Sequence, residues 1–176
     1  MTTIRNLSQA DALDAKAICD IYNHFIETST ATFEEIPIST EEISHRIDKV
    51  LAAKLPWLVI ENEQQQLIGY AYASKWRERS AYRFAVEVSV YLSPQHLGQG
   101  LGLKLYRVLF EQLKALGIRH AIGGITLPNP ASVRLHEKLG MVQAAQFNKV
   151  GLKFGQWLDV GYWQLDFHAE PPQEEG

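Results

Sequence analysis

Hydrophobic positions along the chain switch repeatedly between the period of a strand and that of a helix. Strand-like stretches, alternating or continuously apolar, occur at 3–7, 57–61, 67–76, 86–92, 121–126, 141–150 and 156–167. Apolar residues three or four apart predict helices near 12–26, 40–51, 101–116 and 131–139. Ser8 or Asp11 can cap the first helix, the Ser39-Thr40-Glu41-Glu42 run has the form of a capping box, and Gly140 is suited to end the last helix. This order of elements predicts an α/β (α+β) fold with a central sheet flanked by helices in three layers.

The stretch 86–116 predicts an anion-binding site. An apolar strand there is followed by the glycine-rich turn Gln95–Gly102 and then by a helix. The first N–H groups of a helix lack intrahelical partners, and glycines let a phosphate approach them closely. A P-loop is excluded because no Gly-Lys-Ser/Thr run is present, and Gly98, Gly100 and Gly102 alternate too strictly for the Rossmann pattern. The turn therefore indicates a pyrophosphate cradle, with a packing turn that binds no ligand as the alternative.

Composition and charge limit the classes of function that the protein can have. The chain has 176 residues, 46% of them hydrophobic and 21% charged, which is ordinary for one globular domain, predicted at 1–167. A net charge of −3 gives no support for a nucleic-acid partner. No Cys/His cluster has zinc spacing, so no metal is expected. Without a signal peptide or an apolar run of membrane-spanning length, we expect a cytoplasmic protein with no membrane partner. The Pro- and Glu-rich stretch 168–176 is predicted to be a disordered tail.

Three features outside the glycine turn are candidates for chemistry. Glu87 shares one face of its strand with Ser89 and Tyr91, and a carboxylate there is costly to bury unless it is partnered or functional. It is thus either a general base or the partner of a nearby arginine. The loop 76–83 contains three arginines among aromatic residues, which is suited to holding an anionic group but equally typical of a solvated loop. Cys19 lies within an apolar helical pattern, so we interpret it as a core residue and not a nucleophile.

The run Gln95-x-x-Gly98-x-Gly100 resembles the acetyl-CoA-binding motif of the GNAT superfamily of N-acetyltransferases. A second run, from Asn129-x-x-Ser132 through Leu135-His136-Glu137-Lys138-Leu139-Gly140-Met141, resembles the motif that follows it in that superfamily. The two motifs occur in the usual order and separation, and the resemblance extends from Ile4 to about Phe167. It implies a mixed, mostly antiparallel central sheet with acetyl-CoA as the cosubstrate.

A narrower resemblance is to the phosphinothricin/methionine sulfoximine N-acetyltransferase branch. It rests on Tyr22-Asn23, the stretch 28–35, the loop Arg77-x-Arg79-x-Ala81-Tyr82, the strand 87–91, the run 135–138 and the stretch 149–159. This branch implies a homodimer that acetylates the α-amino group of small amino-acid-like substrates, of the phosphinothricin, methionine sulfoximine or methionine sulfone type. Alternative readings are a GNAT enzyme acting on protein N-termini or lysines, and a non-catalytic acyl-CoA-binding sensor.

The resemblance also implies roles for individual residues. Glu87 would be the general base. His136 stands where many members carry the tyrosine that protonates the departing thiolate, so an acid, a base or a structural role stays open for it. The expected cofactor contacts are Asn129 and Ser132 together with Val88, Val90, Leu92, Leu97, Gly98, Gln99, Gly100, Leu101 and Gly102. Leu97 departs from the family, where a polar or basic residue is common. The expected substrate contacts are Arg77, Arg79 and Tyr82, with Phe33 and Lys153 as further pocket members.

Overall fold

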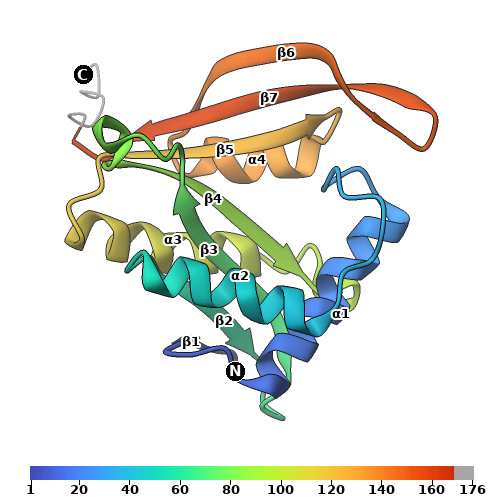
Figure 1. Ribbon diagram of the computed structural model, residues 1–176, viewed down its shortest axis with the longest axis vertical. Coiled ribbons are helices and arrows are strands. Elements are labelled where there is room, and N and C mark those ends of the chain that lie inside the picture. The colour runs from blue at the N-terminus through green and yellow to red at the C-terminus, as the bar shows by residue number, and fades with distance from the viewer. Residues whose placement is uncertain (169–176) are drawn as a thin grey trace.

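The computed structural model describes residues 1–168 and contains one seven-stranded sheet in the order β1-β2-β3-β4-β5-β7-β6 (Figure 1). All neighbouring strands are antiparallel except β4 and β5. The elements are β1 (Thr3–Asn6), α1 (Ala12–Thr28), α2 (Thr40–Ala52), β2 (Trp57–Glu61), β3 (Leu67–Lys75), β4 (Ala85–Leu92), α3 (Leu101–Ala115), β5 (His120–Leu127), α4 (Pro130–Lys138), β6 (Val142–Lys153) and β7 (Gln156–Asp166). The predicted mixed, mostly antiparallel α/β fold is confirmed. Except for His168, the predicted tail 168–176 lies outside the described residues.

The helix ends follow the local sequence signals. Asp11 caps α1 by accepting hydrogen bonds from the N–H groups of Leu13 and Asp14. Ser39 accepts from the Glu42 N–H at the start of α2, as a capping box requires. The Glu42 carboxylate, however, pairs with Arg46 at 2.7 Å, one turn along the helix. Only half of the predicted box is therefore formed.

Helices α1 and α2 cover one face of the sheet, and α3 and α4 cover the other (Figure 1). Helix α3 buries Leu105, Leu109 and Leu113 completely, and each such side chain contributes about 1.5–3 kcal/mol of hydrophobic stabilisation. Cys19 is buried on α1, and burial raises the pKa of its thiol, as expected of a core residue. No helix among residues 1–168 is long and apolar enough to span a membrane.

The sheet opens between its two parallel strands. Strand β4 pairs with β5 only over Ala85–Glu87 and His120–Ile122. Beyond that point β4 continues along β3 as far as Leu92, while β5 continues along β7 as far as Leu127. The two strands diverge in Figure 1, and Glu87 is the last β4 residue paired with β5.

Candidate active site

A cleft of about 630 Å³ occupies the gap between the diverging strands. Its walls come from β4, the glycine turn, the start of α3, the second half of β5, and α4, with Phe25 of α1 and Ala31 of the following loop at its border. Most of the expected cofactor contacts line it: Val88, Val90, Leu92, Leu97, Gly98, Gly100, Leu101, Gly102, Asn129 and Ser132. Gln99 is the one expected cofactor residue that is absent from this lining.

The β4 backbone presents hydrogen-bonding groups to this cleft. The Ser93 N–H donates to the Ile68 carbonyl at 2.8 Å, and the Trp76 N–H donates to the Ala85 carbonyl at 3.3 Å. Hydrogen-bonded and non-hydrogen-bonded pairs alternate along an antiparallel ladder, so the odd-numbered residues of β4 bond to β3. The even-numbered residues, including Val90 and Leu92, direct their backbone groups to the other side, where β5 has already turned away. These groups are available to a ligand.

The glycine turn has the geometry of an anion cradle. Gly98 and Gly100 both adopt φ of 74°, which side-chain-bearing residues rarely take, and a Cβ at either would have no atom within 4 Å. Gly100 is the N-cap of α3 and provides no side-chain cap. The first helical bond runs from the Lys104 N–H to the Gly100 carbonyl, so the earlier N–H groups have no partner within the helix. These N–H groups can therefore donate hydrogen bonds to the oxygens of a phosphate group.

Helix α4 forms the opposite wall. The Asn129 side chain accepts a hydrogen bond from the Ser132 N–H at 3.2 Å and thereby caps the helix. The two motif residues are thus held together at the helix start, and both line the cleft. Gly102 allows α3 to approach α4 closely, because a Cβ there would already lie 3.3 Å from the Leu135 side chain.

Glu87 lies on the other face of the sheet, at the point where β4 and β5 part. Burial raises the pKa of its carboxyl group, although the charge of Arg77 opposes the shift. Among residues 1–168 the carboxylate has no ion-pair partner within 4.0 Å, so the alternative of a simple structural ion pair is not supported. A Cβ at Gly124 would lie 3.6 Å from Glu87 Oε1. Because Gly124 also lines the cleft, the carboxylate reaches the edge of the cavity.

His136 is 3% exposed and lies on the α3–α4 face. Its Nδ1 donates to the Ser132 carbonyl at 2.7 Å, which leaves the lone pair on Nε2. Burial lowers the pKa of the imidazole although this bond opposes the shift, so the neutral form is favoured. A Cβ at Gly123 would come within 2.6 Å of Nε2. Successive glycines on β5 therefore face His136 and Glu87 from opposite sides of the strand.

Aromatic side chains form a wall beside Glu87. The Trp76 and Tyr162 rings pack edge to face with centroids 5.5 Å apart, and Phe147 packs against Tyr162 at 6.0 Å. Tyr162 Cε1 would lie 3.1 Å from a Cβ at Gly124. Sequence reasoning did not single out Phe147 or Tyr162. The only available signal was an aromatic residue on each of two adjacent strands, and the register that brings them together is not readable from the chain.

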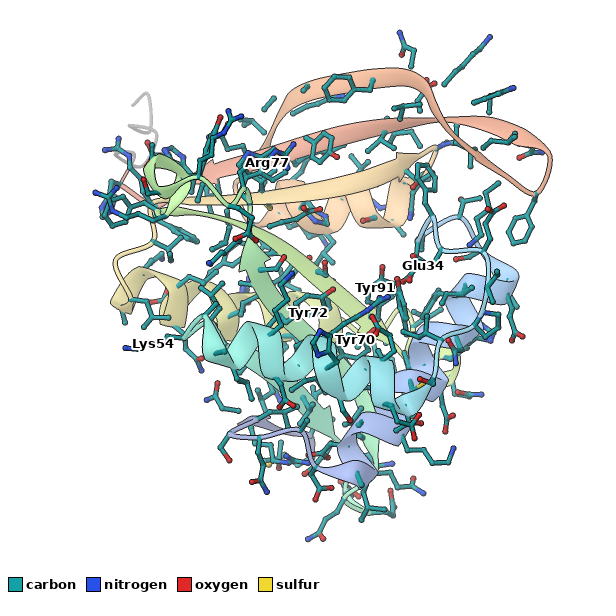
Figure 2. All side chains as sticks on the ribbon, in the orientation of Figure 1. Glu34, Lys54, Tyr70, Tyr72, Arg77 and Tyr91 are labelled. Carbon is teal, nitrogen blue, oxygen red and sulfur yellow. The ribbon has the colours of Figure 1, made fainter. Side chains whose placement is uncertain are left out.

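The five residues expected to contact the substrate lie at two separate places in the structure. Arg77 stacks on Trp76 at 4.1 Å and acts electrostatically on both Glu87 and Tyr162. Arg79 and Tyr82 are exposed, at a short 3-10 turn further along the same loop. Arg77 lies at the opposite end of β4 from Tyr91 (Figure 2).

The other two members lie near that far end. The Phe33 ring packs against Gly151. Lys153 is 1% exposed, and its ammonium group donates to the carbonyls of Ser29 and Thr32 at 2.8 Å each. The expectation that Lys153 faces the pocket is thus corrected, because its polar atom is engaged by the backbone of a neighbouring loop.

Comparison with known proteins agrees with this geometry. Residues 18–141 match the acetyltransferase (GNAT) family. The chain is 43% identical over 163 residues to a phosphinothricin N-acetyltransferase of Streptomyces viridochromogenes, covering 93% of this chain and 88% of the relative. It is 38% identical over 164 residues to an L-methionine sulfoximine/L-methionine sulfone acetyltransferase of Salmonella typhimurium, with coverages of 92% and 95%.

A solved structure shares the whole fold. It is a GNAT superfamily phosphinothricin acetyltransferase from Sinorhizobium meliloti in complex with acetyl-CoA. The TM-score is 0.90 at 36% identity, and the match covers 98% of this chain and 94% of that one. The chain therefore belongs to the acetyltransferase (GNAT) family and is an acetyl-CoA-dependent N-acetyltransferase.

Proposed function

We propose that the protein transfers an acetyl group from acetyl-CoA directly to the α-amino group of a small amino-acid-like substrate. The names of its relatives support substrates of the phosphinothricin, methionine sulfoximine or methionine sulfone type. The observation that carries the proposal is the half-buried Glu87 carboxylate, which has no ion-pair partner among residues 1–168 and adjoins the cleft at Gly124. A base in this position suits an amine that approaches from the face opposite α3 and α4.

The cleft fits the donor molecule group by group. N–H groups at the start of α3 and at Gly98–Gly102 are suited to the diphosphate, and the β4 backbone from Val88 to Leu92 is suited to the pantetheine amides and the thioester carbonyl. Asn129 and Ser132 border the same arm. Bound there, acetyl-CoA supplies an activated acyl carbon with a thiolate leaving group.

Glu87 prepares the amine. The α-ammonium group of an amino acid is largely protonated at neutral pH and cannot attack a carbonyl until it loses a proton. Glu87 accepts that proton, the amine nitrogen forms its bond to the acyl carbon, and the carbon–sulfur bond breaks to release the thiolate. Transfer is direct because the only thiol, that of Cys19, is buried on α1 and contacts the Ile38 carbonyl.

The remaining roles follow from position and charge. Arg77 is close enough to Glu87 for its charge to lower the pKa of that carboxyl group, and it is suited to bind the acidic end of the substrate. Trp76 and Tyr162 contact the aliphatic part of the substrate. Burial lowers the pKa of His136 and so favours its neutral form, whose Nε2 lies next to Gly123; this suits a hydrogen-bond or proton acceptor better than an acid for the thiolate.

A free-thiol release assay tests the proposal. With acetyl-CoA present, we expect release to depend on free amino-acid analogues such as methionine sulfone and not on peptides. Release with peptides alone would favour the rival class that modifies protein N-termini or lysines. Binding of acetyl-CoA by calorimetry, with no release for any amine, would favour the non-catalytic sensor.

The expected homodimer has a candidate interface on the β6–β7 hairpin. Six large apolar side chains there are at least half exposed: Val142, Phe147, Val150, Leu152, Phe154 and Trp157. Such clusters are typical of protein contacts. Light scattering after size exclusion should report twice the chain mass of 19.9 kDa, and replacing Trp157 by Glu should lower it to the monomer value. A monomeric wild type would contradict the dimer. The cytoplasmic location stays a prediction.

A further inference from the structure

The open end of the cleft is bridged by a second contact between the two parts of the sheet. The loop 29–38 follows α1 and belongs to the part that contains β1–β4, whereas the β6–β7 hairpin belongs to the part that contains β5. They meet where Lys153 and Gly151 of β6 touch Ser29, Thr32 and Phe33. We refer to these five residues as the clasp. Figure 1 shows this loop rising beside the hairpin.

Lys153 makes the polar half of the clasp. Its ammonium group donates to the Ser29 and Thr32 carbonyls, both at 2.8 Å, and lies 5.0 Å from the centroid of the Phe154 ring. Burying an ammonium group is costly unless hydrogen-bond acceptors replace water. The two carbonyls provide that replacement, and so tie the loop to the end of β6.

The apolar half is a close contact between Phe33 and Gly151. A Cβ at Gly151 would fall 2.1 Å from Phe33 Cε2, so the ring occupies the space that any larger residue would need. The ladder between β6 and β7 shifts register between Phe147 and Gly151. A glycine next to such an irregularity lets the strand bend and lets the loop approach its backbone.

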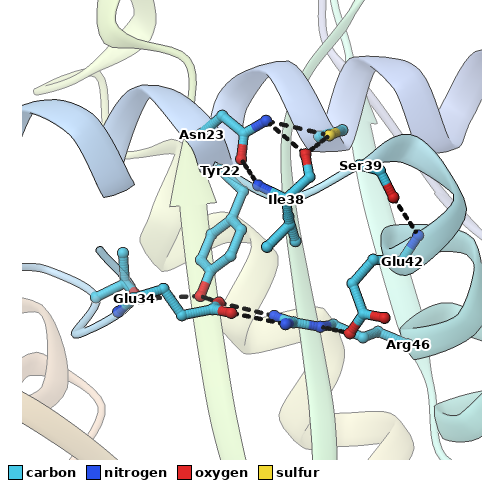
Figure 3. Close-up of polar contacts among 9 residues, drawn as sticks. Tyr22, Asn23, Glu34, Ile38, Ser39, Glu42 and Arg46 are labelled. Carbon is cyan, nitrogen blue, oxygen red and sulfur yellow. Dashed lines mark hydrogen bonds and ion pairs between the residues drawn. The ribbon is translucent and has the colours of Figure 1, made fainter. Parts of the chain in front are cut away.

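The loop itself is anchored to α1 and α2. Glu34 accepts two hydrogen bonds from the Arg46 guanidinium at 2.7 and 2.8 Å and a further one from the Tyr22 hydroxyl (Figure 3). Asn23 bonds both the N–H and the carbonyl of Ile38 at 2.9 Å. Because the loop is held on this side, the clasp places the hairpin relative to the helices and does not merely close a flexible segment.

We propose that Lys153 is a positioning residue: through the clasp it sets the place of Tyr162, which lies on the same hairpin and borders Glu87, and of Phe147, which packs against Tyr162. The inference rests on the proposed function, since its consequence is the shape of the amine pocket. The glycine turn and β4 backbone, which are suited to acetyl-CoA, lie outside the clasp. Loss of the clasp therefore affects the amine and the cosubstrate differently.

Replacing Lys153 by Met removes the ammonium group while keeping the length of the side chain. We expect kcat/KM for the amine to fall by about 10- to 100-fold, mainly through KM, because a displacement of about 1 Å in a positioning element costs that much. The dissociation constant of acetyl-CoA, measured by calorimetry, should change much less than this KM, because Ala31 is the one residue of the segment 29–33 that lines the cosubstrate cleft. Lys149→Met, an exposed lysine of the same hairpin, is the matched control and should behave as the wild type.

Hydrogen exchange separates this inference from the proposed function. In Lys153→Met the backbone amides of residues 29–34 should exchange faster than in the wild type, whatever the substrate is. If neither the exchange rates nor the KM for the amine changed, the proposal that Lys153 acts through the clasp would be wrong. If the wild type released no thiol with any free amino acid, the proposed function would be wrong. The exchange rates would still show whether Lys153 holds the loop 29–34 in place.

A second pair of variants avoids the buried charge. Gly151→Ala should displace Phe33 and raise KM for the amine, whereas the double variant Gly151→Ala with Phe33→Ala should be no worse than Phe33→Ala alone. Strictly additive losses would show that the two residues do not act through their contact, and would contradict the inference.

Discussion

Replacing Glu87 by Gln is expected to lower kcat by about 10²- to 10⁴-fold, the usual contribution of a general base. The amide keeps the size and much of the polarity of the side chain but cannot take a proton from the substrate ammonium. Acetyl-CoA affinity should be nearly unchanged, because the cleft that is suited to the cosubstrate lies beyond Gly124. Single-turnover kinetics and calorimetry on the same preparation measure the two quantities. Glu111→Gln, on the exposed side of α3, serves as the control.

The pH profile provides an independent check on Glu87. The carboxylate acts in its ionised form, and burial raises its pKa above the ordinary value for glutamate. The rate should therefore fall as the pH drops through this raised pKa, and the acidic limb should be absent from the residual activity of Glu87→Gln. Wild-type turnover in that variant, or an unaltered acidic limb, would remove Glu87 from the mechanism.

Replacing Arg77 by Gln is expected to raise KM for the amine substrate by about 10- to 100-fold, because a hydrogen bond to a charged group contributes about 1.5–3 kcal/mol. Its positive charge also lowers the pKa of Glu87, so the acidic limb of the pH profile should move to higher pH in the variant. The effect should disappear for a substrate whose carboxylate is replaced by an amide.

Arg79→Gln is the informative comparison for Arg77. Arg79 lies two residues further along the same loop and is exposed like Arg77, but it is not among the groups that shift the pKa of Glu87. We expect its replacement to change KM much less. If both variants raised KM equally, both arginines would bind the acidic group of the substrate, as the sequence analysis expected.

Local sequence was sufficient to predict the helices and strands and the glycine turn that lines the cleft. Apolar spacing on α3, the Asp11 cap and the glycines at 98 and 100 each act through neighbours within a turn of the chain. Such signals are readable because a helix or a turn is stabilised mostly by contacts close in sequence. For the same reason the glycine turn, the short helix after Asn129 and the position of Glu87 on its strand agree with the prediction, whereas the Asn129 cap was not predicted.

The amine half of the site depends on contacts far apart in the chain. Tyr162 comes beside Glu87 only because β7 pairs with β5 and Gly124 leaves room between them. Lys153 reaches the Ser29 carbonyl across 124 positions, so its spacing gave no hint that its ammonium group is used by a loop. Register and side-chain direction in paired strands are decided by the whole sheet.

The sequence alone therefore determined the family, the order of helices and strands, and most of the residues that line the cleft. Tertiary structure decided where β4 and β5 part, which side of β5 each of Glu87 and His136 occupies, and which side chains surround Glu87. The physical reason is that a helix cap or a glycine turn is specified by a few adjacent residues. A pocket wall is specified by the packing of strands that the chain brings together only when it folds.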